Sequence, residues 1–316
     1  MKTLRILALV ALAGWTASAA RTTAQTIREM AFTFDDLPAS RMQQPVEGIE
    51  RFTRDLLATL QRHEAPAIGF VNEGKLRPNG QLDDRLVGVL RQWRAAGMEL
   101  GNHTYGHLDL HQVPLADVEA DVLRGEAVIR ELLAGSHQQP RFFRHPYLHT
   151  GRSIDIRHSF EAFLKAHAYR VAPVSIDNSD YVFAAAYDMA GEGDRRKIAA
   201  EYVEYMSKVV TFYEGQARML LGRDLRQILL VHASALNGAA FDAFVTHLES
   251  RGYRFITLER ALDDPAYALK DDFVGPGGIS WIHRWAITQH KPKTMFKGEP
   301  EVPEWIARAS GGSNRF

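Results

Sequence analysis

The sequence contains no cysteine among its 316 residues, which excludes disulfide bonds, thiol catalysis and a lipidated cysteine. Neither charge is in excess, with 38 basic and 38 acidic side chains, and lysine and arginine form no block. Because nucleic acids are bound by clustered positive charge, no nucleic acid is expected as the main partner. No internal repeat is present, and the length suits one large core or two modest domains.

The first 24 residues have the features of a secretory signal peptide. Lys2 and Arg5 precede a short apolar run, and Ala17-Ser18-Ala19 is a typical cleavage site, with Ala24 as a second candidate. The apolar run is too short to cross the roughly 30 Å hydrocarbon core of a bilayer, and no later stretch approaches that length. The sequence therefore predicts a periplasmic or secreted protein, without stable membrane insertion after the signal is removed.

Short β-like runs alternate with helical patterns through most of the chain. Strands are expected at residues 30–34, 67–71, 98–101, 141–144, 168–173, 228–231 and 253–256. Helices are expected at residues 49–63, 82–96, 114–133, 153–167, 195–221 and 238–251. This alternation predicts an α/β protein with a mostly parallel sheet and helices outside it. About seven parallel strands favour a distorted (β/α) barrel, followed by a C-terminal extension.

Polar motifs follow the expected strands. They are Asp35-Asp36, His103, Arg144, the segment 177–180, and His232. In barrels of alternating strands and helices, function collects at the carboxyl ends of the strands. The sequence therefore predicts a single site at that end.

Two histidines, His103 and His107, are four residues apart in His-Thr-Tyr-Gly-His. On a helical turn such residues project from the same face. With a carboxylate from a strand end they can bind one divalent cation and leave a position open for water, the arrangement of a catalytic metal site. His111 has the same spacing from His107 and is an alternative ligand, and a polar loop with incidental histidines is the simpler interpretation of the pattern alone.

Taken in order, these motifs resemble those of the NodB-type polysaccharide deacetylases, carbohydrate esterase family 4. The resemblance covers roughly residues 27–262. It divides the chain into a signal peptide at 1–24, a NodB-like catalytic domain at 25–265 and a Trp-containing extension at 266–316. It implies a metal-dependent hydrolase that removes N- or O-linked acetyl groups from a carbohydrate polymer or oligosaccharide, and so acts on amide or ester bonds.

The resemblance also implies roles for individual residues. Asp36, His103 and His107 would bind a divalent metal, most often zinc in this family. Asp35 would be the general base, within hydrogen-bond reach of the attacking water. Arg144, in a motif similar to Arg-x-Pro-Tyr, would pair with Asp35, a task that suits the planar guanidinium.

The segment 177–181 resembles the family's Asp-x-x-Asp-Trp motif, with Tyr181 in place of tryptophan. The resemblance implies that Asp180 holds His232 in its protonated form and that His232 is the general acid. Tyr147 would contribute a backbone N–H near the developing oxyanion. Three tyrosines are expected at the substrate: Tyr105, Tyr147 and Tyr181.

Two other functions are compatible with the sequence. One is a hydrolase of a small non-peptide amide on the same fold, and the other is a catalytically inactive carbohydrate-binding protein. The tryptophans of the extension, Trp281, Trp285 and Trp305, would serve such binding, although packing against the domain is the favoured interpretation. Glu73 and Lys75 are candidates for substrate contact, and surface polarity explains them equally well.

Overall fold

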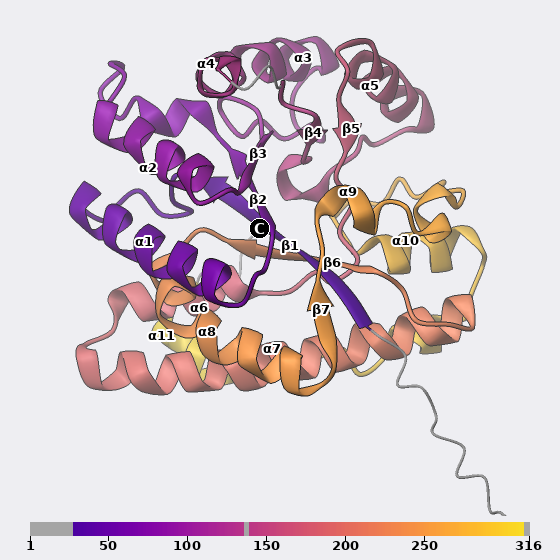
Figure 1. The fold of residues 1–316 in the computed structure, drawn as a ribbon. Helices are drawn as coiled ribbons and strands as arrows, with labels where there is room; N and C mark the ends of the chain where they lie inside the picture. The colour runs from indigo at the N-terminus through magenta and orange to yellow at the C-terminus, as the bar shows by residue number, and fades with distance from the viewer. Residues whose placement is uncertain (1–27, 136–138, 313–316) are drawn as a thin grey trace, which may run out of the picture.

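The computed structural model describes residues 28–135 and 139–312, so the predicted signal peptide lies outside the described residues. Seven parallel strands form one curled sheet (Figure 1), which confirms the predicted fold class. The strands are β1 (Arg28–Leu37), β2 (Ala67–Val71), β3 (Glu99–Asn102), β4 (Phe142–Phe143), β5 (Arg170–Val171), β6 (Gln227–His232) and β7 (Tyr253–Phe255). Their order is β5-β4-β3-β2-β1-β6, and β7 pairs with the start of β1.

The sheet closes on itself beyond β5. Ile176 forms a parallel bridge with Leu229 of β6. The backbone N–H of Ser175 donates to the carbonyl of Ile228 (3.0 Å), and Leu230 N–H donates to the Ile176 carbonyl (3.2 Å). This return of the chain brings the segment before residue 180 beside the end of β6, which is why distant motifs meet.

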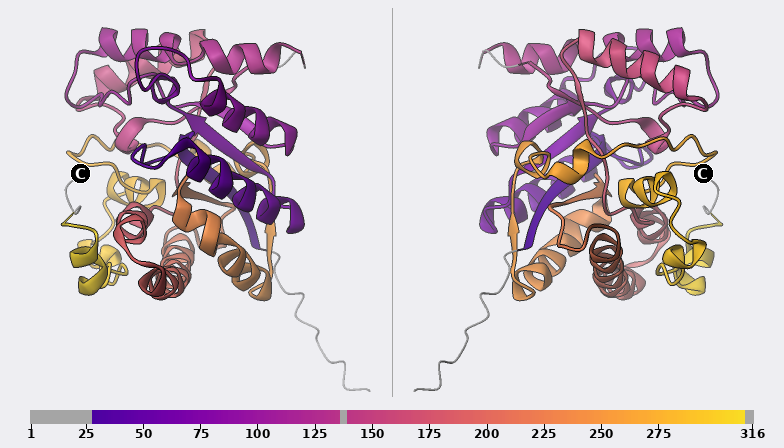
Figure 2. Two further views of the ribbon diagram at one scale, coloured as in Figure 1. Left: turned by 90° about the vertical axis from the view of Figure 1, so that its left-hand side faces the viewer. Right: turned by 90° about the vertical axis from the view of Figure 1, so that its right-hand side faces the viewer.

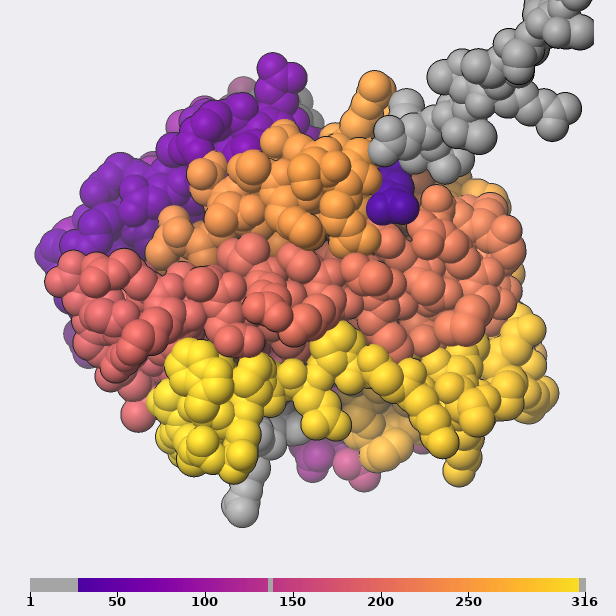
Figure 3. All heavy atoms as spheres, turned by 90° about the horizontal axis from the view of Figure 1, so that it is seen from below, coloured from indigo at the N-terminus to yellow at the C-terminus, as the bar shows by residue number. Residues whose placement is uncertain are grey.

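Helices lie outside the sheet, as Figure 2 shows from two sides. They are α1 (Val46–Arg62), α2 (Asp84–Ala95), α3 (Leu115–Arg124), α4 (Ala127–Ala134), α5 (Ile154–Ala166), α6 (Asp180–Met189), α7 (Glu192–Leu221), α8 (Ala235–Ser250) and α9 (Leu258–Ala261). The long α7 crosses one face between α8 and the C-terminal extension (Figure 3). None of the helices within the described ranges combines the length and apolar character that crossing a bilayer requires.

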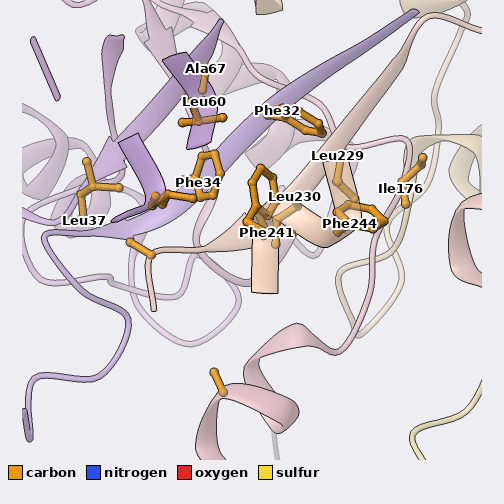
Figure 4. Close-up of a cluster of buried hydrophobic side chains, with 14 of the residues drawn as sticks. Phe32, Phe34, Leu37, Leu60, Ala67, Ile176, Leu229, Leu230, Phe241 and Phe244 are labelled. Carbon is orange, nitrogen blue, oxygen red and sulfur yellow. The ribbon is translucent and has the colours of Figure 1, made fainter. Parts of the chain in front are cut away.

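Side chains alternate along β1, so that one set faces the helices and the other set faces the interior of the barrel. Phe34 points toward the helices, where its ring lies 5.4 Å from that of Trp93 and 5.2 Å from that of Phe241 (Figure 4). Because neighbouring residues of a strand point to opposite faces, Thr33 and Asp35 point into the barrel. The apolar residues on one face therefore anchor the strand whose other face carries the chemistry.

The helices differ from the prediction in three respects. The helix expected at 114–133 is two helices, α3 and α4, separated at Gly125. A Cβ at Gly125 would lie 2.5 Å from the backbone of Thr104 and Tyr105, so this close approach requires glycine. Helix α6 was not predicted, and Asp180 is its first residue rather than the end of a strand. Helices α1, α7 and α8 each begin three residues before the predicted start.

The C-terminal extension packs against the domain. It contains α10 (Trp281–Thr288), a 3-10 helix at Lys293–Phe296 and α11 (Glu304–Ala309). Trp281 and Trp285 are buried, as the packing interpretation expects, whereas Trp305 is 37% exposed. The domain boundaries at residues 24/25 and 265/266 remain predictions.

Candidate active site

The two aspartates after β1 both approach His103 because the strand bulges. Between Phe34 and Leu37 the chain advances three residues while its partner β2 advances two, from Gly69 to Val71. The extra residue falls at Asp35-Asp36, and Asp36 has a φ of 71°. A bulge of this kind re-aims a side chain that regular pleating would turn away. Both carboxylates consequently face the interior of the site.

His103 and His107 also meet there, but not on a helical turn as predicted. They lie in a loop after β3, in which Thr104 and His107 have φ values of 68° and 57°. The His107 N–H donates to Thr104 Oγ1 (2.9 Å), which fixes the turn. The two imidazole centroids lie 4.8 Å apart. The spacing of four thus brings the rings together through a hydrogen-bonded loop.

Asp36, His103 and His107 fit a divalent cation. Their ligand atoms all lie within 4.8 Å of one another. His103 Nδ1 lies 2.8 Å from the Arg144 carbonyl, which can only accept, so the proton is on Nδ1 and the lone pair of Nε2 is directed to the site. Burial and His107 lower the pKa of His103 well below its ordinary value, which keeps the ring neutral. One carboxylate and two neutral imidazoles are a donor set typical of zinc.

Lys75 contacts the carboxylate of this triad, a role that the sequence did not reveal. Its Nζ lies 3.0 Å from Asp36 Oδ1 and 3.2 Å from the Ala39 carbonyl. Burial alone would raise the pKa of Asp36, but Lys75 and His107 outweigh it and hold that pKa well below its usual range. Glu73, by contrast, accepts the backbone N–H of Ile129 (2.8 Å) and so supports α4.

Asp35 is paired with a buried arginine. Arg144 Nη1 lies 3.5 Å from Asp35 Oδ2, and Arg144 Nη2 donates to Thr33 Oγ1 (2.9 Å). Thr33 in turn donates to the Leu229 carbonyl (2.8 Å), so β1 and β6 together position the guanidinium. The Arg144 guanidinium also lies over the ring of Phe70, 4.8 Å from its centroid. The packing leaves Arg144 little freedom to move away from the carboxylate.

Burial of Asp35 makes it a stronger base than an ordinary aspartate. Burial raises its pKa to about 6, against the opposing effect of Arg144. Asp35 Oδ1 is buried and has no hydrogen-bond partner within the described part of the chain. A buried acceptor left without a partner costs free energy, so this oxygen is suited to a water or substrate proton. Asp35 is still mostly ionised at neutral pH, as a base must be.

A second carboxylate holds a histidine at the end of the neighbouring strand. Asp180 Oδ1 lies 2.7 Å from His232 Nδ1, and Asp180 Oδ2 accepts the His232 backbone N–H (2.7 Å). Asn237 donates to Asp180 Oδ2 (3.2 Å) and to the His232 carbonyl (2.8 Å). Although burial opposes it, Asp180 raises the pKa of His232 to about 9. His232 and Asp35 are register partners on β6 and β1, so a protonated histidine stands beside the base.

The three predicted substrate tyrosines are placed differently. The ring of Tyr147 lies 4.5 Å from His107, and Tyr181 packs against His232 at 6.2 Å. Both therefore border the site. The ring of Tyr105 instead lies under the guanidinium of Arg124, 3.6 Å from it, on α3. Tyr105 accordingly has a packing role on this side of the loop.

Asp109, His111 and His149 form a second cluster, separate from the first. Their ligand atoms also lie within 4.8 Å of one another. The His111 and His149 rings are stacked at 3.9 Å with an angle of 8° between their planes. Imidazole lone pairs lie in the ring plane, so stacked rings cannot both point at one ion. His111 also accepts the Gly151 N–H (3.2 Å), and it does not join the Asp36 triad as the alternative ligand would.

Comparisons with known proteins agree with this arrangement. The family described as "Polysaccharide deacetylase" matches residues 22–162. A chitin deacetylase of Colletotrichum lindemuthianum is 24% identical over 235 residues, which cover 74% of this chain and 79% of that protein. Over these residues the chain resembles the polysaccharide deacetylase family of enzymes.

Two further relatives complete the comparison. A chitooligosaccharide deacetylase of Sinorhizobium fredii is 36% identical over 115 residues, 36% of this chain and 45% of that protein, so the match spans less than half of that relative. The crystal structure of a polysaccharide deacetylase from Bacillus cereus superposes with a TM-score of 0.51 at 18% identity, covering 73% of this chain and 91% of that one. At that identity the likeness concerns the fold alone.

Proposed function

We propose that this protein is a polysaccharide deacetylase that hydrolyses N- or O-linked acetyl groups of an acetylated carbohydrate, with Asp35 as general base and His232 as general acid. The observation that carries the proposal is the presence of two neighbouring ion pairs, Asp35–Arg144 and His232–Asp180. Asp35 and His232 lie side by side at the ends of β1 and β6. Asp35 beside Arg144 has a pKa of about 6, and His232 beside Asp180 has a pKa of about 9. Between these values the base is ionised and the acid is protonated, as hydrolysis requires.

We assign the metal to Asp36, His103 and His107, and we propose zinc because one carboxylate and two imidazoles suit it. When bound there, the cation supplies Lewis acidity toward the acetyl carbonyl and makes the attacking water more acidic. The ammonium of Lys75 neutralises part of the Asp36 charge. The Arg144 carbonyl, which accepts from His103 Nδ1, keeps the imidazole in the tautomer that ligation needs.

The proton transfers follow from the positions of the two side chains. Asp35 accepts the proton of the attacking water through its buried oxygen, and Arg144 keeps the carboxylate oriented. The carbonyl oxygen gains negative charge, which the backbone N–H of Tyr147 is proposed to stabilise. His232 then donates its proton to the leaving nitrogen or oxygen, and acetate departs. Asp180 holds the ring through Nδ1.

Asp180→Asn should shift the alkaline limit of activity. In the wild type the rate declines as pH rises through about 9, because His232 loses the proton that it must donate. Without the carboxylate charge, burial alone acts on the ring, so the pKa of His232 falls by about 1 to 3 units. When kcat is measured from pH 6 to 10, its decline at alkaline pH should therefore begin about 1 to 3 pH units lower than in the wild type.

A matched control uses another Asp–His pair. Asp242 Oδ1 lies 2.9 Å from His63 Nε2 at the surface, where 51% of the Asp242 side chain is exposed. Asp242→Asn should leave the pH profile unchanged. An alkaline limit that stays near 9 in Asp180→Asn would contradict the assignment of His232 as the acid.

The substrate class is tested by acetate release. The names of two relatives, a chitin deacetylase and a chitooligosaccharide deacetylase, support an acetylated amino sugar. Purified protein lacking residues 1–24 should be assayed on chitooligosaccharides, acetylated xylan and peptidoglycan fragments, with and without a chelator. Acetate that disappears on chelation and returns with zinc supports the proposal. No acetate from any of them, with one metal bound per chain, would favour a small-amide hydrolase or an inactive binding protein.

We also propose that the protein is exported, to the periplasm or the medium. The n-region, apolar run and small-residue cleavage sites of residues 1–24 support this. The intact mass of protein recovered from the periplasm of a Gram-negative host should correspond to a chain that starts at residue 20 or 25. Recovery of the uncleaved chain from the cytoplasm would contradict export.

A further inference from the structure

The turn that carries Tyr147 has an unusual backbone. Tyr147 and Leu148 are consecutive residues with φ values of 55° and 56°. A non-glycine residue in this left-handed region is strained, and the conformation persists only where the surroundings enforce it. The turn lies next to the metal triad, because the Tyr147 ring packs on His107. Something outside the turn must therefore hold it.

Gly278 of the C-terminal extension packs directly on this turn. A Cβ at Gly278 would lie 1.8 Å from the Tyr147 carbonyl oxygen and 2.7 Å from Leu148 Cβ. Ordinary van der Waals contact begins at 3.4 Å, so only glycine allows the two backbones to approach this closely. The neighbouring Gly277 is different, because a Cβ there would meet no described atom within 4 Å.

The buried side chain of Arg284 links the same segment to Thr150, which follows the turn in the sequence. Arg284 Nη2 donates to Thr150 Oγ1 (2.8 Å), and Arg284 Nε lies 2.7 Å from Asp271 Oδ2. Asp271 also pairs with Arg157 of α5 (3.1 Å). Arg284 is fully buried, so its orientation depends on these partners. We name residues 271–284 the clamp segment.

The clamp segment is also hydrogen-bonded to residues 174–175, which immediately precede the bridge between Ile176 and β6. Trp281 N–H donates to the Val174 carbonyl (2.7 Å), and Ser280 Oγ donates to the Ser175 carbonyl (2.7 Å). The segment therefore runs from a fixed point on the barrel across the outside of the Tyr147 turn. Its contact with that turn is backbone against backbone, which leaves little freedom for the turn to relax.

We propose that the clamp segment positions Tyr147 for catalysis, so that the C-terminal extension is part of the active site. Gly278 is the positioning residue, and it acts through Tyr147. The inference rests on the proposed function, in which the Tyr147 N–H stabilises the developing oxyanion. It gives the C-terminal extension a role in catalysis. Gly278, which would affect the rate, lies about 130 residues after Tyr147 in the sequence.

Gly278→Ala and Gly277→Ala are a matched pair for the test. The same methyl group is added at two adjacent positions, one against the turn and one in open space. In Gly278→Ala the turn must move, and a displacement of about 1 Å can lower the rate about 100-fold. We expect kcat and kcat/KM for acetate release to fall together by about that factor, with KM and metal content unchanged, which indicates a loss specific to the transition state. Gly277→Ala should retain wild-type constants.

Hydrogen exchange of peptides covering residues 145–151 supplies a readout independent of turnover. Exchange should quicken in Gly278→Ala and remain at the wild-type rate in Gly277→Ala. Thr150→Val, which keeps the side-chain shape but removes the acceptor for Arg284, should show a smaller change in the same direction. This milder variant keeps the test decisive if Gly278→Ala does not fold.

The outcomes separate the two proposals. If the wild type releases acetate and both Gly278→Ala and Thr150→Val match Gly277→Ala in kcat and exchange, the clamp is overturned and the deacetylase stands. If the wild type releases no acetate, the deacetylase and the catalytic role of the clamp are both overturned, and the exchange comparison alone decides whether the segment holds the turn.

Discussion

Asp35→Asn should lower kcat for acetate release by about 10²- to 10⁴-fold, the usual contribution of a general base, while each chain still binds one metal. The amide keeps the shape of the carboxylate but cannot accept the proton of the attacking water. Asp35 is not placed among the metal ligands, so affinity for zinc should change little. Steady-state kinetics and metal analysis of the same preparation measure both quantities.

The adjacent residue provides the control for this prediction. Asp36→Asn removes a ligand of the triad rather than the base, so it should lose metal as well as turnover. The two neighbouring substitutions therefore separate proton transfer from metal binding. Asp35→Asn should also remain folded. The amide relieves the desolvation that raises the pKa of Asp35 to about 6, but it leaves the buried Arg144 guanidinium without its partner charge, so a loss of stability short of unfolding is expected. Normal turnover in Asp35→Asn would contradict the proposed base.

The proposed base and the proposed acid both have raised pKa values, but for different reasons. Asp35 is a carboxylate whose pKa rises through burial, and His232 is an imidazole whose pKa rises through Asp180. Register pairing places these residues side by side on β1 and β6. A base and an acid of suitable pKa can thus coexist between pH 6 and 9, which one isolated pair would not provide. The parallel sheet is what brings them together.

Much of this arrangement could be predicted from the sequence, because strand ends carry their own signals. An apolar run followed by Asp35-Asp36 or His232 indicates both the strand and the position of the polar group at its carboxyl end. The bulge in β1 could not be predicted, since it depends on the register with β2. The loop geometry of His103 and His107 was missed for a similar reason, because Thr104 and His107 adopt positive φ values through local hydrogen bonds.

Other features were missed because they depend on contacts between distant segments. Lys75 follows β2 and resembles a surface lysine in sequence, yet the pairing of β2 with β1 brings its Nζ to Asp36. Asn237 lies in α8, where nothing in the local pattern links it to Asp180. Gly278 lies in a Gly/Pro-rich stretch that predicts only a loop. Tertiary contacts of this kind have no local periodicity, so a single sequence does not reveal them.

His107→Ala should abolish metal binding at the concentrations that saturate the wild type, and acetate release should fall to background. Removing one of three ligands is more damaging than loss of a hydrogen-bond partner to a ligand, which already weakens metal binding about 10- to 100-fold. Equilibrium dialysis with zinc measures the affinity without turnover. His111→Ala is the matched control, because that imidazole has the same spacing from His107 but stacks on His149 outside the triad. It should retain one zinc per chain. Loss of zinc from His111→Ala, with retention in His107→Ala, would reverse the ligand assignment and move the metal to the second cluster.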